Sequence, residues 1–140
     1  MNFKLVTLLG IKIDKDVYEI IVPTSTGEIA IFPGHESLVT LAVPGEIAIR
    51  HKKEDSDDNL ERLVISGGVI EINQKSVRIL VDQADYGVDI IESEAKAAYE
   101  RALELKKNAT SQVELDRAHQ LLDRHAVRLK VAELQRHRRR

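Results

Sequence analysis

The carboxylates are the first side chains to test for acid–base chemistry. Glu28, Glu46 and Glu71 fall in segments that alternate apolar and polar residues, which is typical of strands. None of them is paired in the sequence with a nucleophile, an oriented base or a metal ligand, as catalysis would require. We therefore predict no catalytic residue, and an enzyme is the least supported of three functional hypotheses.

Histidines and glycines also fail to form a recognisable ligand site. No two histidines are spaced i, i+4, and His119 and His125 fall on different faces of a helix, so we predict no metal site. His125 lies on an apolar stripe and is expected to be partly buried and hydrogen-bonded. Gly67-Gly68 lacks the further residues of a phosphate-binding loop and predicts a hairpin bend. The acidic run 54–58 lacks the spacing of a calcium loop.

Short strands must carry most of these residues. From Phe3 to Gln83, apolar residues occur in short runs, many of which alternate with polar ones, as in 28–31, 46–50 and 77–82. Turn residues separate the runs at roughly 8 to 12 residue spacing, with no helical segment between them. This pattern predicts an antiparallel β-sandwich or barrel.

Two helices are expected to follow the strands. An apolar stripe with steps of four and three predicts the first helix, and it is formed by Ile91, Ala95, Ala98, Ala102, Leu105 and Ala109. Ser111 and Glu114 form a capping box that predicts the start of the second helix. Its inward face is expected to contain Leu115, Ala118, Leu122, Leu129 and Ala132. The short link predicts an antiparallel hairpin, whose Ala-rich seam buries little area and can open.

Composition and charge separate the two parts. Residues 1–89 hold 9 Lys and Arg against 15 Asp and Glu, a net charge of −6, whereas residues 90–140 hold 12 against 8, a net charge of +4. Aromatic residues make up only 4%, which disfavours stacking on nucleic acid. The chain has no cysteine and no run of about eighteen apolar residues, so we expect a reducing compartment and no membrane span.

One segment carries a family resemblance. Residues 27–40 read GEIAIFPGHESLVT, which closely resembles the signature of ATP synthase epsilon subunits. Further similarity follows in the same order at 44–45, 66–72, 77–80 and 128–134, so the match spans nearly the whole chain. Ala30 stands where the family commonly has Gly.

The resemblance implies a non-catalytic subunit of a rotary, proton-transporting F-type ATP synthase. It implies a sandwich of about ten strands, residues 1–87, that binds the gamma subunit and rests on the c-ring, followed by a two-helix regulatory domain with a basic tail, residues 88–140. The resemblance further implies a place in the central stalk, which couples ion transport to ATP synthesis in this family. Its place would be the cytoplasmic face of the bacterial inner membrane or the stromal face of the thylakoid, with membrane contact only through partner subunits.

The resemblance also implies which residues contact the c-ring. In similar proteins the edge that includes Glu28 and His35 faces the loops of the c-ring. Pro33 fixes φ and Gly34 permits a left-handed turn, so His35 is expected to project from a rigid corner. The alternative is an ordinary tight turn whose histidine caps a neighbouring carbonyl. Phe32 is expected to share an exposed strand face with Glu28, opposite buried Ile29 and Ile31.

Bacterial relatives often bind ATP through an Ile/Leu-Asp-x-x-Arg-Ala motif at the start of the first helix. The corresponding segment here reads IIESEA, residues 90–95, which places Ile91 at the Asp position and Glu94 at the Arg position. Glu94 would repel a phosphate, so we predict no bound cofactor and weak or absent ATP binding. Calorimetry tests this, and a micromolar affinity would contradict it.

The second helix carries a basic face. Arg117, Arg124 and Arg128 step by seven and four, so they lie on one side of a helix and can meet an acidic surface together. In the family this helix can extend into the alpha/beta catalytic head, which implies an inhibitory contact. A solvated polar face is the alternative.

A nucleic-acid-binding or adaptor protein that uses the basic hairpin is the second hypothesis. The pI of about 6.2, the acidic sandwich and the scarcity of aromatics argue against it, and we predict no nucleic-acid partner. Binding measured at two salt concentrations separates the hypotheses, because phosphate contacts are strongly salt-dependent.

Overall fold

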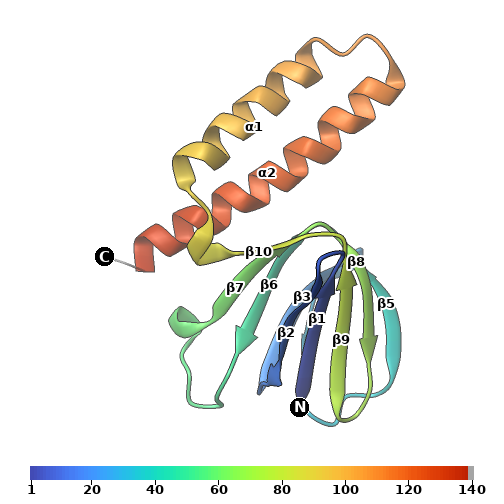
Figure 1. The fold of residues 1–140 in the computed structure, drawn as a ribbon, viewed down its shortest axis with the longest axis vertical. Coiled ribbons are helices and arrows are strands. Elements are labelled where there is room, and N and C mark those ends of the chain that lie inside the picture. Colours follow the sequence, from blue (N-terminus) through green and yellow to red (C-terminus); the bar gives the residue numbers. More distant parts are fainter. Residues whose placement is uncertain (139–140) are drawn as a thin grey trace. The chain divides into compact units, whose positions relative to one another are not determined.

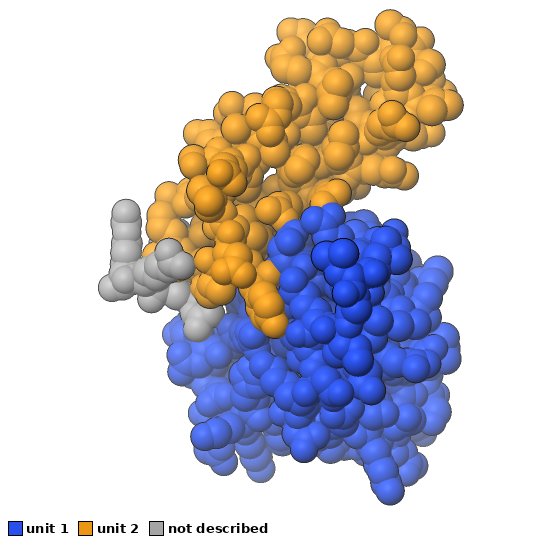
Figure 2. All heavy atoms as spheres, viewed as in Figure 1, with its two compact units in different colours: residues 1–85 blue, residues 86–140 orange. Residues whose placement is uncertain are grey.

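The structure is a computed structural model that describes the backbone of residues 1–138 and the side chains of residues 1–136. Arg139 and Arg140, the end of the expected basic tail, lie outside the described residues. The chain divides into two compact units, residues 1–85 and residues 86–140 (Figure 2). Each unit is described by itself.

Ten strands form the first unit (Figure 1), which confirms the predicted β-sandwich. Their order in the sheet is β10-β7-β6-β3-β5-β8-β9-β1-β2, with β4 paired to β3 alone. The strand bounds are β1 Asn2–Thr7, β2 Gly10–Asp16, β3 Glu19–Thr24, β4 Gly27–Ile31, β5 Leu38–Ala42, β6 Gly45–Arg50, β7 Glu61–Ile65, β8 Gly68–Ile72, β9 Ser76–Val81 and β10 Ala84–Tyr86. The alternating runs at 28–31, 46–50 and 77–82 correspond to β4, β6 and β9.

The strand order folds into two layers that share one core. A single pair, Thr24 with Ala42, joins β3 to β5 and marks the corner between the layers. Alternate residues of each strand point inward, and the fully buried side chains include Phe3, Leu5, Ile20, Ile47, Ile49, Leu63, Ile70 and Ile79. Each such aliphatic side chain contributes about 1.5–3 kcal/mol when it leaves water. The core is therefore aliphatic, as the scarcity of aromatics requires.

Two details differ from the sequence-based expectation. The β1–β9 pair is parallel, whereas its neighbours β1–β2 and β8–β9 are antiparallel. A tight turn forces antiparallel pairing only between strands close in sequence, and these two are far apart. The predicted hairpin at Gly67-Gly68 was wrong, because β7 pairs with β6 while β8 pairs with β5 and β9.

Gly68 explains why the chain needs glycine at this crossover. The residue pairs with Ala42 on one side and Val81 on the other. A Cβ atom there would lie 1.9 Å from the carbonyl oxygen of Leu80. The close approach of two backbones thus excludes any side chain.

The second unit is an antiparallel helical hairpin (Figure 1). Helix α1 spans Glu92–Lys107 and helix α2 spans Gln112–Arg138, preceded by a short 3-10 turn, η2, at Gly87–Asp89. The hydroxyl of Ser111 accepts a hydrogen bond of 3.2 Å from the Glu114 amide, as the capping box predicts. The Glu114 carboxylate, however, accepts from the amide and hydroxyl of Thr110 rather than from Ser111.

Small side chains dominate the seam of the hairpin. Ala95 and Ala102 of α1 are buried, as are Ala118 and Leu122 of α2. Leu105, which the stripe also includes, remains 54% exposed. An Ala-rich seam buries less apolar area than a Leu-rich one, so the two helices are held together weakly.

Candidate functional site

The strand register aligns an apolar row across the outer face of the β5-β8-β9-β1-β2 layer. Each residue in the row pairs with the next across the strands: Leu41, Val69, Leu80, Val6 and Ile11. Leu41 is 65% exposed and Ile11 61% exposed, while the three central residues are half-buried. We call these five residues the apolar row.

Two leucines continue the apolar row at one end. Leu8 and Leu9 form the turn between β1 and β2, and Leu9 is fully exposed. The Thr7 hydroxyl accepts a hydrogen bond from the Leu9 amide and donates one to the carbonyl of Gly10, which fixes the turn. Because contiguous exposed apolar surfaces are typical of interaction sites, the apolar row is a candidate binding surface.

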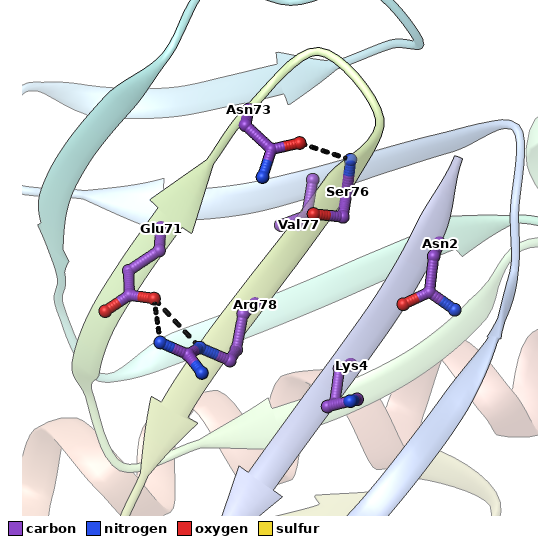
Figure 3. Close-up of a pocket in the computed structure, with 7 residues that line it drawn as sticks. All are labelled: Asn2, Lys4, Glu71, Asn73, Ser76, Val77 and Arg78. Carbon is purple, nitrogen blue, oxygen red and sulfur yellow. Dashed lines mark hydrogen bonds and ion pairs between the residues drawn. The ribbon is translucent and has the colours of Figure 1, made fainter.

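A polar row runs beside the apolar row on the same face. The register pairs Glu71 with Arg78, Arg78 with Lys4, and Lys4 with Asp14. Arg78 donates two hydrogen bonds to one carboxylate oxygen of Glu71, at 2.8 Å from Nε and 2.5 Å from Nη2 (Figure 3). Because the charges neutralise one another in pairs, the face presents little net charge to a partner.

A shallow pocket of about 290 Å³ lies where the polar row reaches the end of the sheet (Figure 3). Asn73 builds one wall, because its side-chain oxygen accepts hydrogen bonds from the amides of Lys75 and Ser76. This Asx-type turn fixes the connection between β8 and β9. The pocket presents polar groups on the side of the polar row that faces away from the apolar row.

The loop predicted to contact the c-ring is a rigid turn. The His35 amide donates to the Phe32 carbonyl over 3.2 Å, and Gly34 has φ of +86°, as the third residue of a type II turn requires. The Gly34 amide also donates to the Gln74 carbonyl over 2.9 Å, which joins this loop to the β8–β9 turn. His35 is held by its Nδ1, which lies 2.7 Å from the Glu36 carbonyl.

Phe32 and Glu28 lie at opposite ends of the same strand face. Phe32 is 41% exposed and packs edge-to-face on Tyr18, with ring centroids 5.7 Å apart. Glu28 is exposed near the start of β4, about 13 Å away at the usual strand rise. The expected burial of Ile31 is confirmed, but Ile29 is only half-buried because β4 pairs with β3 alone.

The residues at the degenerate ATP motif lie where α1 begins. Ile91 is the N-cap residue and is 55% exposed, and Glu94 is exposed in the first turn. Glu92, also in this turn, accepts a hydrogen bond of 2.9 Å from Arg136 near the end of α2. Sequence reasoning missed this pair, because 44 residues separate its members and no local pattern links them.

The three arginines of the predicted basic face differ in their surroundings. Arg117 is exposed, whereas Arg124 and Arg128 are half-buried along α2. His125 lies between the last two, and burial lowers its pKa, with Arg124, Arg128 and Arg101 adding to the effect. His125 is partly buried, as expected, but its buried Nδ1 has no hydrogen-bond partner among the described residues.

Sequence reasoning also missed the apolar row, although the sequence contains a signal for it. Runs such as 38–42 and 77–81 contain apolar residues at both odd and even positions. In a two-layer sandwich one of the two faces must point outward, so such a run predicts an exposed apolar face.

Among the described residues, no cluster of three or more potential metal ligands is present.

Together, the described elements define the class of two-layer β-sandwich proteins that carry a helical hairpin after the sandwich. The family model of the ATP synthase delta/epsilon chain, beta-sandwich domain, matches residues 1–87. The chain belongs to this ATP synthase family.

Curated relatives agree with the family match. The ATP synthase epsilon chain of Ruthia magnifica subsp. Calyptogena magnifica is 39% identical over 88 residues, which is 63% of this chain and 60% of that protein. The ATP synthase epsilon chain of Delftia acidovorans is 38% identical over 96 residues, 69% of this chain and 67% of that protein. The chain therefore spans about two thirds or less of the length of these relatives.

Solved structures share the fold. A chain of the Euglena gracilis mitochondrial ATP synthase, solved as an OSCP/F1/c-ring assembly, superposes with a TM-score of 0.80 at 22% identity, covering 94% of this chain and 79% of that chain. A chain of the Tetrahymena thermophila mitochondrial ATP synthase, solved as a central stalk and c-ring, gives a TM-score of 0.64 at 15% identity, with 94% and 96% covered. At these identities the likeness concerns the fold.

Proposed function

We propose that this chain is a non-catalytic subunit of the central rotor stalk of an F-type ATP synthase, where it takes part in coupling ion translocation to ATP synthesis. The family match over residues 1–87 and the epsilon chain relatives support this role. The observation that carries the proposal is the apolar row, because a subunit that works only within a complex needs a permanent partner surface.

The gamma subunit is the partner that we assign to the apolar row. A rotor stalk transmits torque, so the two subunits must remain associated, and stable interfaces are more apolar than transient ones. The apolar row and the exposed leucines Leu8 and Leu9 supply such a surface. The charge pairs of the polar row leave it without a net charge that would oppose docking.

The c-ring is the partner that we assign to the edge formed by Glu28 and the turn 32–35. The type II turn holds Phe32, Pro33, Gly34 and His35 in one fixed arrangement, and the hydrogen bond from Gly34 to Gln74 supports it. A rigid turn suits a polar contact, because little conformational entropy is lost on binding. Glu28 extends this contact along the edge strand.

The hairpin is proposed to restrain ATP hydrolysis by contacting the alpha/beta catalytic head through Arg117, Arg124 and Arg128. Its weakly packed seam is compatible with a helix pair that separates and extends. Guanidinium groups on one helix face suit an acidic surface. Residues 1–87 would then be the rotor-binding domain and residues 88–140 the regulatory domain.

Membrane association is proposed to be peripheral and to depend on partner subunits. Among the described residues, the structure has no helix of the length and apolar character needed to cross a bilayer. A position on the cytoplasmic face of the bacterial inner membrane, or on the stromal face of the thylakoid, follows from the proposed contact with the c-ring.

ATP hydrolysis by the purified catalytic head that contains gamma tests the proposal. The head is titrated with the full chain and with a form that ends at Gly87, whose fold is checked by circular dichroism. We expect both to bind and the full chain alone to inhibit. If neither form binds, the proposed role in the rotor stalk is excluded. If both bind and neither inhibits, the chain takes part in coupling ion translocation to ATP synthesis without restraining ATP hydrolysis.

A further inference from the structure

His125 lies beside a groove between the two helices of the hairpin. The groove has a volume of about 460 Å³ and is lined by Ala98, Arg101, Ala102, Glu104, Leu105, Asn108, Leu121 and His125. The ring nitrogen Nδ1 of His125 is inaccessible to solvent and has no hydrogen-bond partner among the described residues. A titratable atom without access to solvent therefore lies on the α2 side of the groove between the two helices.

This placement determines which protonation state of the His125 imidazole the packed hairpin favours. A neutral imidazole can carry its hydrogen on Nε2 and leave Nδ1 as an acceptor without a donor. An imidazolium carries hydrogens on both nitrogens, so Nδ1 would become a buried charged donor with no acceptor. The packed hairpin therefore accommodates the neutral form of His125 and disfavours the cation.

Charges from both helices add to this preference. Arg101 of α1, together with Arg124 and Arg128 of α2, acts on His125 with like charge, although burial is the largest cause of its lowered pKa. Glu104 of α1 is the carboxylate that lines the same groove. The like charge of the three arginines makes the surroundings of the ring less favourable to a further positive charge.

We propose that His125 is a proton-sensitive switch of the hairpin: the neutral ring permits the packed pair of helices, and protonation of the ring drives the pair apart. In the separated state Nδ1 can donate to water, and the distance from Arg101 increases. The enclosure of Nδ1 and the weak Ala-rich seam carry this inference.

The direction of the pH effect follows from linkage. The pKa of His125 is lowered from its ordinary value of 6.5 in the packed hairpin. The packed state is therefore favoured fully above pH 6.5 and loses this advantage as pH falls from 6.5 toward the lowered value. Within that window the ratio of open to packed hairpin rises at most about tenfold per pH unit, since one proton is bound.

The switch itself is a property of the isolated chain. Its consequence for ATP hydrolysis rests on the proposed function, because an open hairpin inhibits only if the helices reach the catalytic head. A distance measurement on the isolated chain therefore tests the switch without testing the role in the synthase.

Spin labels on the two helices provide that measurement. The sequence contains no cysteine, so Lys96→Cys and Glu133→Cys introduce two unique sites, both of them exposed. Pulsed electron resonance then gives the distance distribution between the labels from pH 8 to pH 5. We expect a short distance above pH 6.5 and a growing long-distance population below it.

Variants identify the group that titrates. With His125→Leu the short distance should persist to pH 5, whereas His119→Leu, an exposed histidine on the same helix, should leave the transition unchanged. Arg101→Gln removes a like charge and so lowers the pKa of His125 less in the packed hairpin, which should move the opening to lower pH or reduce its extent. A distance that is constant from pH 8 to pH 5 in the unsubstituted background, or a transition that survives in His125→Leu, would overturn the proposal.

Discussion

Arg136, near the end of α2, donates a hydrogen bond of 2.9 Å to the carboxylate of Glu92 in the first turn of α1. The pair thus joins the two ends of the hairpin that lie farthest from its connecting loop. Both side chains are partly solvated, with exposed fractions of 48% and 32%. The contact therefore adds a small stabilisation to a hairpin whose seam is itself weakly packed.

Exchanging the charges of this pair measures how much the ion pair stabilises the hairpin. Glu92→Arg and Arg136→Glu should each loosen the hairpin by about 0.5 kcal/mol, because partly exposed ion pairs contribute little. The double exchange should recover most of the loss. Thermal unfolding followed through the helical signal, combined in a double-mutant cycle, gives the coupling. A coupling of zero would mean that the pair does not close the hairpin.

Substitution of Gly68 tests the crossover between the two layers. Gly68→Ala places a Cβ atom 1.9 Å from the Leu80 carbonyl oxygen, which belongs to backbone and cannot rotate away. The sandwich should lose more than about 3 kcal/mol of unfolding free energy. In urea unfolding, Gly10→Ala serves as the control, since nothing lies within 4 Å of it and only its positive φ costs about 1 kcal/mol.

Gly68 also marks the boundary of what the sequence predicts. Local periodicity was sufficient to predict the strand runs, the alanines of the helical stripe and the cap formed by Ser111, whereas Ile91 and Leu105 of that stripe are exposed. It could not predict that Gly68 lies against Leu80, because that approach depends on strand pairing across the sheet. Nor does alternation alone decide which of two apolar strand faces points outward, so the apolar row required the register.

If the apolar row binds the gamma subunit as proposed, charged substitutions in it should weaken that binding. Leu41→Glu and Ile11→Glu place a charge at exposed positions and should leave the fold intact. Each should weaken binding to isolated gamma at least about tenfold, because burial of an unpaired carboxylate opposes an apolar interface. Val113→Glu, at a position 74% exposed on α2, is the matched control. Calorimetric affinities equal to the control would exclude the apolar row as the gamma surface.

Glu61 predicts how the sandwich responds to acid. Its carboxylate accepts hydrogen bonds from Lys15 at 3.0 Å and from His51 at 2.7 Å when the imidazole carries a hydrogen on Nε2. Burial acts to raise its pKa, but these two partners outweigh it and lower the pKa below its ordinary value of 4.5. The stabilisation is therefore present above pH 4.5 and lost as pH falls through the lowered value.

Urea unfolding of Glu61→Gln at two pH values checks this expectation. At pH 6 the substituted chain should be less stable than the original chain, and at pH 3 the difference should shrink. Glu54→Gln, an exposed position in the acidic loop, should show no such change. A difference that is the same at both pH values would mean that the carboxylate charge contributes nothing.

The inhibitory contact can be separated from hairpin packing by comparing arginines. Arg124→Glu should lose inhibition of the catalytic head, but Arg124 is half-buried beside His125, so its replacement also disturbs the hairpin. Arg117 is exposed on the same helical face and makes the cleaner test. Arg117→Glu should weaken inhibition about tenfold, since a like charge replaces an attraction at an acidic surface.

Lys130 supplies the control for charge. It is exposed on the opposite side of α2, so Lys130→Glu changes the net charge of the helix equally without altering the basic face. Inhibition should be retained in this variant, and the loss caused by Arg117→Glu should shrink at high salt as surface charges are screened. Equal losses in both variants would indicate attraction to net charge alone, and unchanged inhibition with Arg117→Glu and Arg124→Glu would show that the basic face does not reach the head.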